Sequence, residues 1–194
     1  LLAQGSPAAV VSIEAPGAND AGVYHNAGGM DVSVLEAKTD ALWAKLRELG
    51  VPSVAIGDLG NEIGMGKIAD HIRSFVPFTA HGECSCGCKG GILAQSTATC
   101  SDWGCYGLMA ALAYLLRNID ILHTEEMEAE VMRAASRSGL IDMTGSLLPG
   151  IDGFNLKMNV SILSLMRQCT DYALRYSHRS DRWFGPVLEK HFFE

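Results

Sequence analysis

The stretch Ser53-Val-Ala-Ile-Gly-Asp-Leu-Gly-Asn-Glu-Ile-Gly-Met-Gly66 passes directly from a short apolar run into a loop rich in glycine and carboxylates. Its first four residues are typical of a buried strand, and the region from about Lys67 to Phe75 is expected to form the helix that follows. In α/β folds built from such units, ligands bind beyond the carboxyl ends of the strands. The stretch therefore predicts both the fold class and the place of a site.

The same alternation of strand and helix continues on both sides of this stretch. We expect further strands over residues 8–13 and 91–99, a loop over residues 142–153, and helices over residues 36–49, 103–117, 124–139 and 156–176. This order predicts an α/β fold, a three-layer Rossmann-like sandwich with a mostly parallel sheet. Because the chain starts at Leu1 rather than at methionine, we expect residues 1–194 to be a single domain whose N-terminal portion is missing.

Composition limits the classes of partner. The chain has 194 residues, 48% of them hydrophobic and 19% charged, with a net charge of -7. A negative chain does not suit nucleic acid, which needs a basic surface, but it can still hold a small anionic substrate. We expect no membrane span, because no apolar run approaches about 18 residues. A homo-oligomer is compatible with the sequence.

Six cysteines are present, and only those of Cys84-Ser-Cys-Gly-Cys88 are closely spaced. This is not the pattern of a secreted disulfide framework, so a reducing, intracellular compartment is expected. The cluster of Cys84, Cys86 and Cys88 could bind zinc or copper(I) through its thiolates. The alternative is a flexible loop that is prone to oxidation.

The loop Gly57–Gly66 is the first candidate site. Its glycines allow a ligand to approach the backbone closely. Asp58 and Glu62 supply carboxylates and Asn61 a neutral oxygen, a donor set that suits Mg²⁺ or Mn²⁺ better than zinc. The start of the following helix favours an anion. The alternative is an ordinary turn in which the two carboxylates are solvated or cap a helix.

Other acidic residues also follow predicted strands. Glu14 ends the first strand and needs a partner there, either a metal or a lysine or backbone amides. Asp102 follows a later strand, where it either caps a helix or faces the edge of the sheet. Asp31 lies in a polar loop, in which each residue can also be explained as a turn former.

Four segments together resemble one known family. The stretch Gly57–Gly66 resembles the signature G-D-G-G-N-E-I-G-M-G of the D-glutamate cyclase-like C-terminal domain family, with Leu59 in place of a glycine. Glu14-Ala-Pro-Gly17 resembles its E-R-P-G, with Ala15 in place of an arginine that would hold a substrate carboxylate. Two further stretches, residues 24–33 and 101–107, resemble Y-x-N-x-x-G-x-D-I-S and S-N-W-G-G-Y-A, with Asp102 in place of asparagine.

The resemblance implies a Rossmann-like domain that binds a divalent metal, Mn²⁺ or Mg²⁺, and a lyase that converts D-glutamate to 5-oxo-D-proline and water. We assign Glu14, Asp58 and Glu62 to the metal and Asp31 or Asp102 to proton transfer. For substrate binding we assign Asn61, Gly64, Gly66 and Lys67.

Three rival hypotheses remain open. The same acidic site could serve a metal-dependent phosphatase or hydrolase acting on a small phosphorylated substrate. It could also hold a ligand without turnover, or the cysteine cluster could form a thiol-metal module. Because relatives in the family include mitochondrial proteins, the cytoplasm and the mitochondrial matrix are both expected locations.

Overall fold

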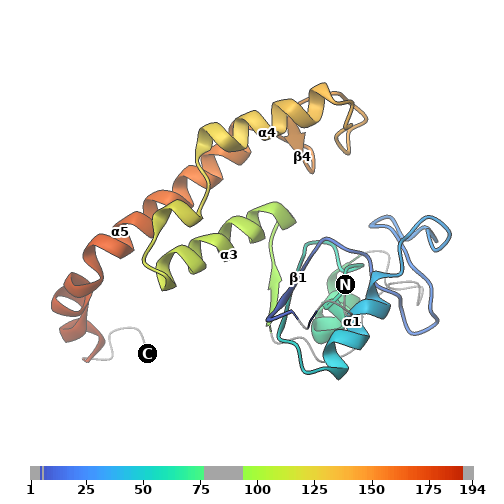
Figure 1. The fold of residues 1–194 in the computed structure, drawn as a ribbon, viewed down its shortest axis with the longest axis horizontal. Coiled ribbons are helices and arrows are strands. Elements are labelled where there is room, and N and C mark those ends of the chain that lie inside the picture. Colours follow the sequence, from blue (N-terminus) through green and yellow to red (C-terminus); the bar gives the residue numbers. More distant parts are fainter. Residues whose placement is uncertain (1–4, 6, 77–93, 190–194) are drawn as a thin grey trace. The chain divides into compact units, whose positions relative to one another are not determined.

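The computed structural model describes residue 5 and residues 7–76 and 94–189 (Figure 1). The chain divides into two compact units, residues 1–105 and 106–194, and each is considered by itself. The prediction of a single domain therefore stays a prediction. The cysteine cluster at residues 84–88 and the first part of the strand expected from Gly91 lie outside the described residues.

The first unit contains a three-stranded parallel sheet. Its strands are β1 (Val10–Ile13), β2 (Ser53–Gly57) and β3 (Ala94–Thr97), in the order β1-β2-β3. Parallel pairing was expected, because each of these strands is followed by a loop and a helix. The chain is thus an α/β protein with a small parallel sheet. On β1 the side chains of Val11 and Ile13 are 45% and 51% exposed, and the three-layer sandwich remains a prediction.

Short helices accompany this sheet. Helix α1 (Thr39–Glu48) buries Trp43 and Leu46, and it is followed by Gly50, whose φ of 70° is favourable for glycine. The 3-10 turn η2 (Met65–Ile68) leads into α2 (Ala69–Phe75). The core of the unit is formed by buried apolar side chains from β2, the following loop and α2, namely Ala55, Ile56, Ile63, Met65 and Ile72.

The boundary between the units falls inside helix α3 (Ser101–Leu115). The second unit continues with the 3-10 turn η4 (Ile119–Ile121), helix α4 (Glu125–Arg137) and helix α5 (Leu156–Leu188). Thr124 is the N-cap of α4, since its Oγ1 accepts a hydrogen bond from the amide of Met127 at 3.3 Å. Among the helices in the described ranges, none is both long and apolar enough to cross a bilayer.

A small hairpin corrects the expectation of a plain loop before α5. Strands β4 (Gly150–Ile151) and β5 (Phe154–Asn155) pair in antiparallel fashion. Asp152 and Gly153 join them with φ values of 53° and 79°. Positive φ at both central residues is the geometry that matches the twist of a two-residue hairpin, and Asp-Gly is a preferred pair there.

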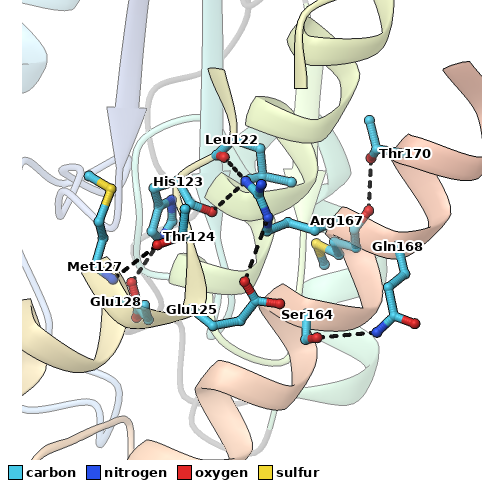
Figure 2. A network of polar contacts seen from close by, with 11 residues as sticks. Leu122, His123, Thr124, Glu125, Met127, Glu128, Ser164, Arg167, Gln168 and Thr170 are labelled. Carbon is cyan, nitrogen blue, oxygen red and sulfur yellow. Dashed lines mark hydrogen bonds and ion pairs between the residues drawn. The ribbon is translucent and has the colours of Figure 1, made fainter. Parts of the chain in front are cut away.

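A buried polar network joins the segments of the second unit (Figure 2). Glu128, 7% exposed, accepts a hydrogen bond from the hydroxyl of Tyr106. It also lies 2.8 Å from Nε2 of His123. Arg167 of α5 donates to the carbonyls of Leu122 and His123. Because a buried carboxylate is costly unless it is paired, the contacts with Tyr106 and His123 explain how Glu128 is accommodated.

Candidate functional site

The loop that follows β2 is organised around the side chain of Glu62. Glu62 Oε1 accepts the amides of Asp58 at 2.8 Å and Leu59 at 2.9 Å, and Oε2 accepts the amide of Gly60 at 2.7 Å. The residue is only 1% exposed. Three amides around one carboxylate satisfy a buried charge, so Glu62 fixes the backbone that carries Asp58. Its predicted role as a metal ligand stays a prediction.

Two glycines allow this arrangement. A Cβ at Gly57 would lie 2.6 Å from Cε of Met65 and 2.9 Å from Cδ of Glu62, so no other residue fits without displacing the carboxylate. Gly60 has a φ of 98°, and its Cβ would lie 2.8 Å from Cγ2 of Ile72. The glycine pattern in the sequence therefore reflects close packing inside the loop as well as any approach of a ligand.

Carboxylates from two neighbouring strands converge at the edge of the sheet. Glu14 follows β1 and Asp58 follows β2, and ligand atoms of the two side chains lie within 4.8 Å of each other. The amide of Glu14 donates to the carbonyl of Ile56 at 3.0 Å, which continues the pairing of the two strands. Asp58 Oδ2 also accepts the amide of Ser101, the first residue of α3, at 3.2 Å. Oxygen ligands in this arrangement could bind a divalent cation.

A third acidic residue, Asp102, makes the potential at this edge more negative. Its Oδ2 lies 4.0 Å from Sγ of Cys100. The pKa of the nearby Cys105 thiol is raised to about 11 by burial, and further by the charges of Asp102 and Glu14. Cys105 is therefore a protonated thiol at neutral pH, which does not favour a role as a nucleophile. An anionic substrate would need a compensating positive charge here.

Residues 24–33 form a second loop, which is tied to the loop Gly57–Gly66. Asn61 Nδ2 donates to the carbonyl of His25 at 3.1 Å, and Asn61 O accepts the amide of Gly17 at 2.9 Å. Asn61 is thus used to join the two loops. Asp31 is exposed, and hydrogen bonds from Ser33 lower the pKa of its carboxyl group. A lowered pKa makes Asp31 a weaker base than an ordinary aspartate.

The expected anion-binding residues lie at the start of a short helix. Gly64 has a φ of 97° and caps the 3-10 turn η2, and its carbonyl accepts the amide of Lys67 at 3.0 Å. Lys67 is exposed. Because η2 and α2 are short, the helix itself offers little dipole, and a positive charge for an anion would come from Lys67. The substrate-binding role of Gly64, Gly66 and Lys67 stays a prediction.

Sequence reasoning missed two features of this unit. Ser101 is fully buried beside Asp58, and the sequence signal for it was its match to the first residue of S-N-W-G-G-Y-A. Tyr24 donates a hydrogen bond to Asp40, and its ring lies 3.8 Å from the ammonium group of Lys38, which holds the second loop against the start of α1. The tyrosine in the motif therefore has a structural explanation.

Comparison with known proteins agrees with these motifs. Residues 3–167 match the family model described as D-glutamate cyclase-like, C-terminal. The chain belongs to this family. It is also 34% identical over 109 residues to the protein named D-glutamate cyclase, mitochondrial, of Homo sapiens. That alignment covers 55% of this chain and 17% of the human protein, so the chain corresponds to a small part of that relative.

Proposed function

We propose that this chain carries the site of a divalent-metal-dependent cyclase, a hydro-lyase that converts D-glutamate to 5-oxo-D-proline and water. The observation that carries the proposal is the convergence of Glu14 and Asp58 at the ends of neighbouring strands, in a chain that belongs to the D-glutamate cyclase-like family. The human relative is named D-glutamate cyclase, which supports D-glutamate as the substrate. That relative is named as mitochondrial, and for this chain we propose an intracellular location, in the cytoplasm or the mitochondrial matrix.

The donor set fits Mn²⁺ or Mg²⁺. Two carboxylates whose ligand atoms lie within 4.8 Å repel each other, and a cation bound between them would relieve that repulsion. In the proposed site Glu14 and Asp58 hold the ion, and Glu62 keeps Asp58 in place through the loop amides. When bound, the cation polarises the γ-carboxyl group of the substrate and stabilises the negative charge that develops on its oxygen.

The protein's own residues would orient the substrate and move its proton. Ring closure forms a bond between the α-amino nitrogen and the γ-carboxyl carbon, and one γ-carboxyl oxygen leaves as water. The α-amino group starts as an ammonium group and keeps one proton as the amide N–H. In this proposal Asp102 accepts the other two protons in turn and passes both to the leaving γ-carboxyl oxygen, which departs as water. Asp102 is preferred to Asp31, because hydrogen bonds from Ser33 lower the pKa of Asp31. Lys67, with the backbone of Gly64 and Gly66, would hold the α-carboxylate.

A substrate panel tests this proposal. Purified protein is incubated with D-glutamate, L-glutamate and a set of small phosphorylated compounds, each with EDTA, Mg²⁺ or Mn²⁺. We expect 5-oxo-D-proline from D-glutamate in the presence of metal. Release of inorganic phosphate without any 5-oxoproline would instead favour the phosphatase hypothesis, and metal binding without either product would favour a ligand-binding domain.

A further inference from the structure

The first residue of α3 carries a hydroxyl group that the proposed reaction has not yet used. Ser101 is 0% exposed, and among the described residues its Oγ has no hydrogen-bond partner. Burial of a hydroxyl without a hydrogen bond costs free energy, and nearly all buried polar side chains are paired. The Ser101 hydroxyl therefore needs an explanation.

The backbone of Ser101 contacts the acidic site. Its amide donates to Asp58 Oδ2 at 3.2 Å, so the residue lies directly against one of the two converging carboxylates. Asp102, the proposed proton acceptor, follows it in the first turn of α3. The serine thus contacts, through its amide, the carboxylate proposed to hold the cation, and it directly precedes in the sequence the residue proposed to move the proton.

We infer that Ser101 Oγ binds the substrate by donating a hydrogen bond to an oxygen of its reacting carboxyl group; this rests on the proposed cyclase function. Carboxylates dominate the neighbourhood, and they can only accept hydrogen bonds when ionised. A substrate oxygen that gains negative charge during ring closure needs a donor, which a hydroxyl supplies without adding charge. The inference adds a substrate-contacting residue, and it specifies a substrate with a free carboxyl group.

The test replaces Ser101 by alanine, which keeps the amide that Asp58 accepts. We expect kcat for D-glutamate to fall by about 100-fold, the size seen when one such donor is removed. The melting temperature and the Mn²⁺ affinity should stay unchanged, because the hydroxyl has no partner in the described protein to lose. Ser12→Ala, at a serine on β1 that is 5% exposed, is the matched control and should retain activity.

The outcomes separate this inference from the proposed function. Wild-type turnover together with normal kcat in the Ser101→Ala variant would overturn the inference alone. So would a joint loss of activity, Mn²⁺ affinity and melting temperature, which would show a structural role. If the wild type gives no product, calorimetric titration with D-glutamate and Mn²⁺ decides: a roughly 10-fold or greater loss of affinity in the variant supports the contact. A wild type that neither converts nor binds D-glutamate refutes both proposals.

Discussion

Replacing Glu62 by glutamine removes one charge from the centre of the site loop and changes little else in size. In the wild type the carboxylate accepts three amides at 2.7–2.9 Å. The glutamine keeps one acceptor oxygen for the amides of Asp58 and Leu59, but its own NH₂ group would face the amide of Gly60. Two hydrogen bonds therefore become neutral, and the third becomes a contact between two donors.

The size of the effect follows from these contacts. A hydrogen bond to a charged group contributes about 1.5–3 kcal/mol, against about 1 kcal/mol for a neutral one. Because Glu62 is 1% exposed, water does not replace the lost acceptor. One bond lost and two weakened give a decrease of about 2–4 kcal/mol in the free energy of unfolding. For a chain of this length, that lowers the melting temperature by about 5–15 °C.

Differential scanning calorimetry at pH 7 measures this decrease, with Glu48→Gln as the matched control. Glu48 is exposed and pairs with Lys45 at 2.8 Å on the surface of α1, so its loss should leave the melting temperature nearly unchanged. Turnover should also fall in Glu62→Gln, because the loop no longer fixes Asp58. A Glu62→Gln variant as stable as Glu48→Gln would refute the reasoning that the carboxylate organises the loop.

Three further predictions concern other parts of the structure. Gly57→Ala should lower both the melting temperature and turnover, because its Cβ would lie 2.6 Å from a neighbouring side chain. The control Gly107→Ala, whose Cβ meets nothing within 4 Å, should lower neither. Cys105 should react slowly with iodoacetamide at pH 8 and faster as the pH approaches 11, and the exposed Cys169 should react before it. Peptide mass spectrometry distinguishes the two labelled cysteines. Rapid labelling of Cys105 at pH 7 would contradict the raised pKa. Hydrogen bonds from Gly153 and Thr144 lower the pKa of Asp142 from its ordinary value of 3.8. The ionised carboxylate therefore stabilises the fold at pH values above 3.8, and this stabilisation is lost as the pH falls through the lowered pKa. The melting temperatures of wild type and Asp142→Asn should therefore differ at pH 6 and converge in acid; a difference independent of pH would argue against a role for the charge.

The sequence predicted the edge of the sheet well because simple rules apply there. Continuous apolar runs located β1 and β2, and parallel strands then placed Glu14 and Asp58 at the same edge of the sheet. That β1 and β2 are neighbours was not predicted from the sequence and comes from the structure. The direction of a side chain inside a loop follows no such rule. Whether Glu62 faces a cation or the loop amides depends on the backbone path between residues 57 and 62, which the residue types alone do not determine.

Other differences have specific physical causes. The helix expected from Glu36 begins at Thr39, because Leu35 and Glu36 both donate their amides to the carbonyl of Val32 in a preceding turn. The hairpin at residues 150–155 was missed because two-residue strands are too short to show alternation. The Asp152-Gly153 pair was the available signal, since it is a preferred hairpin turn.

The most direct test of the central claim is the rate of 5-oxo-D-proline formation from D-glutamate by wild type and Asp58→Asn after removal of metal and readdition of Mn²⁺. Asparagine keeps the shape of the side chain but not its charge, so the variant should fold and fail to hold the cation. We predict product from the wild type only when Mn²⁺ is restored, and none from Asp58→Asn. Equal turnover in EDTA, or full activity in Asp58→Asn, would contradict the account.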